Sequence, residues 1–594
     1  MRAGRTWTAA PEIGATTFVE GARLTDLKAK PYCLTEEDIS WVTRTVAGMD
    51  VDTKIGQLFC LLAFSSEEAE AKETLKVIQP GGILFRPSPG ADLQRIVRFL
   101  QNTSPLPMLI AANLERGGNG ITTDGTYFAS PMQVAATDDE EQAYRLGVIC
   151  GREGSAVGCN FTFSPDVDLD LNFQNPITNT RTFGSDPERV LRMAKAYMRG
   201  AHENGIATCV KHWPGDGVDS RDQHLVTTVN TLSCEKWDNS YGRVYRGMID
   251  AGADAVMCGH IQLPAYTHRL APGIPDEDVM PASLAPELNQ LLLRKQLGFN
   301  GLLITDVTAM AGFTMLMPRA KAVPYSITAG NDMFLFTLNL HEDVEFMRQG
   351  VRNGILSLER LNEAVTRILA LKASLKLHDR KAAGTLVPDE SALKILSCAE
   401  HRTWTTECAA KSVTLVKDTA RLLPLSVEKH RRILLYALGD DGGYLGENAS
   451  SGNETFRKLL EAEGFVVEKF DYNKSMGERW AMVFKSIQVL KREYDLILYY
   501  ASLQTASNQT VVRINWAAPL GFDSPRFLSD IPTAFVSVEN PYHLQDVPRI
   551  KTLINGYSGT TEVVTAIVHK LLGKSSFEGI NPVDPFCGYW DAKL

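Results

Sequence analysis

The stretch Ala207–Gly215 reads ATCVKHWPG and ends an apolar run of strand length in a lysine and a histidine, Lys211 and His212. Pro214 and Gly215 then mark a turn. Runs that are apolar on both faces are typical of parallel sheets covered by helices. The stretch therefore predicts one strand of a buried parallel sheet, with polar groups at its carboxyl end.

Seven further runs of strand length lie between residues 55 and 340. They are Ile55–Phe64, Gly81–Arg86, Pro107–Glu115, Asn160–Leu169, Ala255–Ile261, Gly301–Val307 and Met333–Asn339. Helical spacing of apolar residues appears between the runs, as in Asp92–Gln101 and Pro187–Gly205. Eight alternating units predict an α/β fold, a TIM-like (β/α)8 barrel.

The chain beyond the barrel predicts a second, smaller unit. The helix Leu358–Leu377 would close the barrel, and a polar stretch typical of a linker follows it. From about Arg431, strands and helices alternate again. We expect an N-terminal catalytic barrel over residues 1–375 with an extension of about residues 1–40, a linker over 376–411, and a three-layer α/β sandwich domain over 412–594.

Composition narrows the classes of function. The net charge of −9 does not indicate the excess of basic residues that is typical of proteins that bind nucleic acid. The ten cysteines are scattered along the chain, which is typical of reduced thiols. The N-terminus lacks the apolar run of a signal peptide, and no stretch approaches the ~20 apolar residues of a membrane helix. We expect a cytoplasmic protein with no nucleic-acid or membrane partner, no metal and no cofactor.

Polar side chains follow five consecutive predicted strands. They are Asn113 and Glu115 after the third strand, Asp166 and Asp168 after the fourth, Lys211 and His212 after the fifth, His260 after the sixth and Asp306 after the seventh. The loop after the fourth strand adds Arg181. Because the carboxyl ends of barrel strands meet at one rim, these groups indicate an active site there.

Two carboxylates and an imidazole stand out for their chemistry. Asp306 directly follows LLIT, so it is either a helix N-cap or a nucleophile fixed on a rigid strand end. His224 lies two residues after Asp222, in the loop that follows KHWPG. A carboxylate beside an imidazole can hold one tautomer and stabilise the imidazolium, although a surface histidine beside a charge gives the same pattern.

Together these motifs resemble glycoside hydrolase family 3, in its β-N-acetylhexosaminidase branch. The resemblance spans roughly Val51–Leu377 and rests on KHWPGDG, DQH, NPITNTRTFG, LGFNGLLITD and AGNDM. It implies a retaining, exo-acting β-N-acetylglucosaminidase that removes terminal β-linked N-acetylglucosamine through a covalent glycosyl-enzyme intermediate. Cell-wall recycling is one setting for such carbohydrate chemistry.

The resemblance also implies roles for particular residues. Asp306 would be the nucleophile and His224 the general acid/base, with Asp222 tuning it. The residues expected to bind the sugar are Arg181, Lys211, His212, Asn113 and Asp166. Three positions depart from the branch: Asn113 stands where Asp is common, Gly117–Gly120 lacks an arginine, and Asp216 replaces a histidine.

Several alternatives stay open. A neutral imidazole does not repel an anionic acceptor, so phosphorolysis by phosphate competes with hydrolysis. Three further hypotheses have less support from the sequence. They are a β-glucosidase, a Zn²⁺-dependent hydrolase that uses His212, His260 and Asp306, and a sugar-binding protein without activity. The second domain would supply a loop to the site or a homodimer contact, and Ser502–Trp516 is the segment we favour for it.

Overall fold

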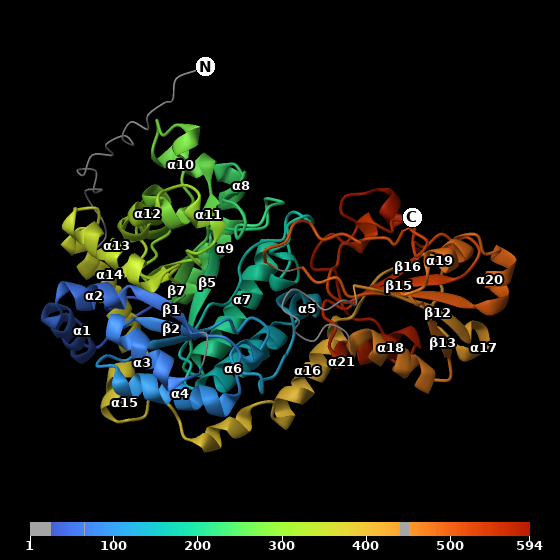
Figure 1. Cartoon of the computed structure of the whole chain (residues 1–594), viewed down its shortest axis with the longest axis horizontal. Helices are drawn as coiled ribbons and strands as arrows, with labels where there is room; N and C mark the ends of the chain where they lie inside the picture. Colours follow the sequence, from blue (N-terminus) through green and yellow to red (C-terminus); the bar gives the residue numbers. More distant parts are fainter. Residues whose placement is uncertain (1–24, 64–65, 440–450, 506, 519) are drawn as a thin grey trace.

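The computed structural model describes residues 25–63, 66–439, 451–505, 507–518 and 520–594. A barrel and a smaller sheet domain lie side by side, and helix α16 (Ala399–Ser412) runs from one to the other (Figure 1). The extension expected over about residues 1–40 lies outside the described residues as far as residue 24. Its described part leads into α1 (Glu36–Gly48), which begins with a capping box at Thr35.

Eight parallel strands form the barrel, in the order β10-β1-β2-β3-β4-β5-β7-β9. Their bounds are β1 Phe59–Ala63, β2 Gly82–Phe85, β3 Leu109–Ala112, β4 Phe161–Thr162, β5 Ala207–Trp213, β7 Ala255–Cys258, β9 Leu302–Thr305 and β10 Phe334–Leu335. A parallel bridge between Ile304 and Met333 closes the ring between β9 and β10. The predicted (β/α)8 fold is confirmed, with one strand from each of the eight apolar runs.

Helices cover the outside of the barrel. Their bounds are α2 Val51–Gln57, α3 Glu68–Val77, α4 Gly90–Thr103, α5 Pro131–Ala136, α6 Glu140–Ala156, α7 Pro187–His202, α8 Cys234–Asp238, α9 Tyr241–Ala251, α10 Pro264–Leu270, the π-helix Glu287–Gln296, α11 Ala311–Thr314, α12 Arg319–Thr328, α13 Leu340–Arg352 and α14 Leu358–Ser374. Helix α4 shows why they pack: it buries Leu93, Ile96, Val97 and Leu100 along one face.

Two segments differ from their sequence-based description. The first apolar run opens as α2, because Asp50 caps that helix by accepting from the Thr53 backbone N–H at 2.7 Å, so the strand starts only at Phe59. The polar stretch after the barrel contains α15 (Leu377–Ala382) and a 3₁₀ helix (Glu390–Ile395). That stretch packs on α4, where Arg98 donates to the Pro388 carbonyl at 2.7 Å.

The second domain is a six-stranded sheet in the order β11-β16-β15-β14-β12-β13. The bounds are β11 Thr414–Asp418, β12 Arg432–Leu438, β13 Val466–Lys469, β14 Leu496–Ala501, β15 Thr533–Ser537 and β16 Thr552–Asn555, with helices α17 Val427–His430, α18 Ser451–Ala462, α19 Met476–Val483, α20 Ile487–Glu493 and α21 Thr561–Leu571. Alternate residues of β14 enter two separate cores: Leu498 packs with α18 and α21, and Tyr499 packs on the α19 and α20 side. Helices on both faces give the predicted three layers.

A buried interface joins the two domains at the rim of the barrel. Met132 of α5 shares an apolar cluster with Tyr542 and Tyr557 of the sheet domain. The Tyr542 hydroxyl donates to Asp170 in the loop after β4 at 2.5 Å. The loop that follows β15 in the second sheet therefore lies against the loop that follows β4 in the barrel. A search of the described helices for a segment suited to spanning a bilayer finds none.

All ten cysteines are free thiols, and most of them are buried in the two domains. Burial raises the pKa of the Cys60 thiol to about 12, which keeps it protonated and unreactive. The buried cysteines therefore act as small apolar side chains in the core.

Candidate active site

Glu115 holds two cations at the end of β3. Arg181 donates to it through Nε at 3.1 Å and Nη2 at 2.9 Å, and Lys211 Nζ donates to the same carboxylate. Burial raises the pKa of Glu115, but the charges of Arg181 and Lys211 outweigh it and hold that pKa well below its usual range. We call these three residues the clamp; they form a charged, preorganised group of hydrogen-bond donors and acceptors.

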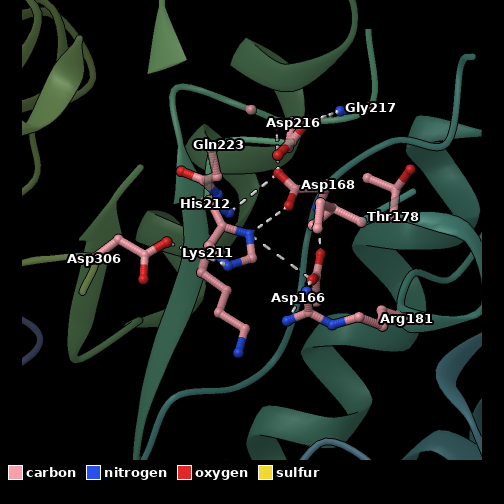
Figure 2. A network of polar contacts seen from close by, with 12 residues as sticks. Asp166, Asp168, Thr178, Arg181, Lys211, His212, Asp216, Gly217, Gln223 and Asp306 are labelled. Atoms are coloured by element: carbon pink, nitrogen blue, oxygen red, sulfur yellow. Dashed lines mark hydrogen bonds and ion pairs between the residues drawn. The ribbon is translucent and has the colours of Figure 1, made fainter. Parts of the chain in front are cut away.

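His212 is oriented by Asp168 on the neighbouring strand end. Its Nδ1 lies 2.7 Å from Asp168 Oδ2, and its backbone N–H donates to Oδ1 at 3.1 Å. Burial lowers the pKa of His212, yet Asp168 and other nearby carboxylates produce a net rise. Figure 2 shows the result: Asp168 on one side of the ring and Asp306 on the other, with Nε2 3.9 Å from Asp306 Oδ2.

Asp166 is buried beside the clamp, in surroundings that disfavour its charged form. Its pKa is raised well above the ordinary value, first by burial and then by the charge of Asp168. Arg181 Nη2 lies 3.8 Å from its Oδ2. A carboxyl in its protonated form can donate a hydrogen bond as well as accept one, which suits recognition of a neutral hydroxyl group.

Asp306 stands immediately after β9, as its sequence position predicted. Its backbone N–H donates to the Cys258 carbonyl at 2.7 Å, and its Oδ1 accepts from the Val307 N–H at 2.7 Å. Burial raises its pKa, but electrostatic interactions, first with His212, and the hydrogen bond from the Val307 N–H bring that pKa below the ordinary value. Oδ2 has no hydrogen-bond partner within the described chain, so an ionised oxygen faces His212 with its orientation fixed by the strand.

His224 and Asp222 form a hydrogen-bonded pair on the loop after β5, and we call them the dyad. Nδ1 of His224 lies 2.6 Å from Asp222 Oδ1, which also accepts the His224 backbone N–H at 2.8 Å. The loop rests on the segment that follows Asp306, because Ala311 N–H donates to the His224 carbonyl at 3.1 Å. The dyad and the carboxylate of Asp306 thus come from separate loops that touch.

His260 is held by contacts of its ring nitrogens with other groups of the protein. Its Nδ1 lies 2.9 Å from Ser283 Oγ and its Nε2 lies 3.0 Å from the Val307 carbonyl. Burial lowers its pKa, which favours the neutral ring. Because both ring nitrogens of His260 are engaged within the protein, the arrangement gives the Zn²⁺ hypothesis on His212, His260 and Asp306 no support.

The positions that depart from the family pattern lie in different settings. Asn113 follows β3 with an exposed side chain. Asp216 is buried behind the imidazole of His212: its backbone N–H donates to Asp168 Oδ1 at 2.7 Å, and its Oδ1 accepts from Asn175 at 2.9 Å. Burial, with the charge of Asp168, raises the pKa of Asp216 to about 8.

The structure brings the predicted groups together at one rim of the barrel. Sequence reasoning placed Glu115 and Asp168 at the rim without giving either a role. Only the contacts show that these two carboxylates orient the cations and the imidazole. Asn508 was missed altogether as a contact of Asp222, although Ser502–Trp516 was the segment singled out; a backbone N–H leaves no signature in sequence.

Residues 50–371 match the model of the glycosyl hydrolase family 3 N-terminal domain. Together with the strand-end carboxylates and the dyad, this match defines the class: the chain belongs to glycosyl hydrolase family 3.

Three similar proteins show which members of this family the chain resembles. A protein of Cellulomonas fimi named β-N-acetylglucosaminidase/β-glucosidase is 46% identical over 96% of this chain and 100% of its own length. A solved β-glucoside phosphorylase, BglX, is 46% identical with a TM-score of 0.89, over 95% of this chain and 99% of that chain. A family 3 β-N-acetylglucosaminidase from Paenibacillus, at 23% identity and a TM-score of 0.76 over 91% of this chain and 100% of that chain, shares the fold.

Proposed function

We propose that this protein is a retaining, exo-acting β-glycosidase that removes terminal β-linked N-acetylglucosamine, with Asp306 as nucleophile and His224 as proton shuttle. One observation carries the proposal: an ionised, strand-fixed carboxylate oxygen and a carboxylate-bound imidazole occur on separate, touching loops. A double displacement needs a nucleophile and a separate acid/base of this kind. The Cellulomonas relative, named for both activities, supports the sugar class.

The first chemical step would form the covalent intermediate. A carboxylate oxygen of Asp306 bonds to the anomeric carbon while the bond from that carbon to the leaving oxygen breaks. The leaving oxygen takes a proton from the imidazolium of His224, and Asp222 stabilises that imidazolium before transfer. The charge that leaves Asp306 is thereby matched by the charge lost at His224.

The second step would return the enzyme to its starting state. A water molecule attacks the anomeric carbon, one of its protons passes to the neutral imidazole of His224, and the bond from that carbon to Asp306 breaks. Two displacements at one carbon retain the β configuration. The clamp, with His212, Asn113 and Asp166, would hold the hydroxyl groups of the bound sugar throughout.

Phosphate is a second candidate acceptor, and a specific finding favours it. The solved phosphorylase matches this chain at a TM-score of 0.89, and it acts on β-glucosides by its name. A neutral imidazole base admits an anion, whereas a carboxylate base would repel it. In that case the product would be a sugar 1-phosphate in place of the free sugar.

Product analysis with and without phosphate tests both proposals. We expect aryl β-N-acetylglucosaminides to be cleaved faster than aryl β-glucosides, with the first-formed product in the β configuration by NMR. A sugar 1-phosphate that replaces the free sugar at millimolar phosphate assigns phosphorolysis. An α product formed first, or no cleavage of either substrate, would contradict the retaining mechanism.

A further inference from the structure

The Asp222 carboxylate has a third hydrogen bond, which comes from the second domain. Its Oδ1 serves His224, while its Oδ2 accepts from the backbone N–H of Asn508 at 2.5 Å. The Asp222 side chain is fully buried, with 0% of its surface exposed. The carboxylate is therefore enclosed between the barrel loop and a segment 286 residues further along the chain.

The segment that carries Asn508 is anchored in the sheet domain. It leaves the end of β14, and a few residues later Arg513 Nε donates to Asp546 Oδ1 at 2.7 Å. The Ile514 N–H donates to the other oxygen of Asp546 at 3.2 Å. Asn508 itself has φ of 66°, in the left-handed region, which asparagine adopts more readily than most residues.

The sheet domain is in turn fixed against the barrel. Ser558 donates to Gln133 of α5 at 2.8 Å, and Ser130 donates to the Tyr557 carbonyl at 3.1 Å. These contacts are buried and flank the apolar cluster of Met132 and Tyr557. A group supported by packed elements on both sides holds its position more precisely than one on a free loop.

A backbone N–H that bonds a carboxylate stabilises the ionised form and limits its rotation. We propose that the backbone amide of Asn508 is a positioning group for the proton shuttle, because it keeps the Asp222 carboxylate turned toward His224. Proton transfer at His224 then depends on docking of the second domain. This inference rests on the proposed function and deepens it, because it assigns the sheet domain a part in acid catalysis.

The test compares kcat/KM for two aglycones, a 2,4-dinitrophenyl and an alkyl β-N-acetylglucosaminide. The alkyl leaving group needs a proton, and the dinitrophenyl group does not. Asn508→Pro removes the N–H and the left-handed φ together. We expect it to lower kcat/KM about tenfold for the alkyl substrate and less than about twofold for the dinitrophenyl substrate, a part of the roughly 10²–10⁴-fold that a general acid supplies.

Two matched variants separate the N–H from the backbone strain. Asn508→Val keeps the N–H but strains the left-handed φ, and Asn508→Gly keeps both the N–H and the φ. Any loss in either variant should be equal for the two substrates. A selective loss in Asn508→Val, or equal losses in Asn508→Pro, would overturn the assignment of the N–H.

A double-mutant cycle shows whether Asn508 acts through the dyad. In an Asp222→Ala background, Asn508→Pro should cause no further selective loss for the alkyl substrate. An undiminished selective loss there would refute a route through Asp222.

If Asn508→Pro does not fold, Asp546→Ala takes its place, since it frees the segment beyond Asn508 from the sheet domain. The same selective loss is expected from it, and equal losses on the two substrates would overturn the inference. The proposed function is judged separately, by the loss of all turnover in Asp306→Ala on both substrates.

Discussion

The clamp and the dyad solve the same problem of fixing charged groups in different ways. The clamp is built within the barrel: Glu115, Arg181 and Lys211 come from strand ends and one loop, and Glu115 accepts hydrogen bonds from both cations. The dyad lies on a loop, and its Asp222 carboxylate accepts a hydrogen bond from Asn508 in the second domain. In the proposed mechanism, the part of the site that would hold the sugar lies within the barrel, whereas the part that would transfer the proton is completed by the second domain.

The largest loss of activity should come from replacing Asp306, the proposed nucleophile. Asp306→Ala should lower kcat about 10⁴–10⁶-fold for every substrate, because the nucleophile is lost. Azide should partly restore turnover of an activated substrate and give the α-glycosyl azide, since it attacks from the vacated face. If Asp306→Ala kept a tenth of the parent activity without azide, Asp306 could not be the nucleophile.

The dyad should show a loss that depends on the leaving group. His224→Ala should lower kcat/KM about 10²–10⁴-fold for alkyl substrates and about tenfold or less for dinitrophenyl substrates. Azide should here give the β-glycosyl azide, because it attacks the intact intermediate on Asp306. Equal losses on both kinds of substrate would count against an acid role.

The clamp should show the opposite pattern, a loss that ignores the leaving group. Glu115→Gln leaves two buried cations without their counter-charge, a change that typically costs about 3–5 kcal/mol. We expect a lower Tm and a fall in kcat/KM of about 100-fold for all aglycones.

The matched control for the clamp is Glu407→Gln, which breaks an exposed ion pair with Arg145 at 2.6 Å. Such pairs contribute about 1 kcal/mol or less, so activity and Tm should stay close to the parent values. If Glu115→Gln behaved like this control, the clamp would have no special role.

The smallest effect concerns stability and pH. The pKa of Asp216 is raised to about 8 in the folded protein, so the folded state binds this proton more tightly than the unfolded state. Its contribution to stability is present at low pH and is lost as pH rises toward 8. Asp216→Asn keeps an acceptor for Asn175 and cannot ionise.

We therefore expect the Tm of Asp216→Asn minus that of the parent to grow between pH 5 and pH 8 and to level off above it. Differential scanning calorimetry across this range measures it. A difference that stays constant with pH would show that Asp216 does not titrate in this window.

Sequence reasoning reached the fold because the signal is local and repeated. Each barrel strand comes from an apolar run, such as the fully buried Leu302–Thr305. Boundaries were harder, since Ile55 is as apolar as a strand residue and becomes helical only through the cap at Asp50. The edge strand β13, with exposed Val466 and Glu468, lacks the buried pattern from which such strands are predicted.

The candidate site was predictable only in part, for a physical reason. Residues at strand ends, such as His212 and Asp306, could be placed because barrel topology brings strand ends together. The carboxylates that set their charge could not be assigned, because those contacts depend on side-chain direction. The bond from Asn508 to Asp222 joins two domains through a main-chain group, which no residue type reveals.

The most direct test of the account is to identify the residue that becomes covalently bound to the sugar. The enzyme is incubated with a fluorinated N-acetylglucosaminyl fluoride that forms the intermediate but releases it slowly, and the labelled peptide is mapped by mass spectrometry. We expect one sugar per chain, attached to Asp306 in the peptide containing GLLITDV, and no label in Asp306→Ala. A label on another residue, or none while the substrate turns over, would contradict a glycosyl-enzyme at this carboxylate.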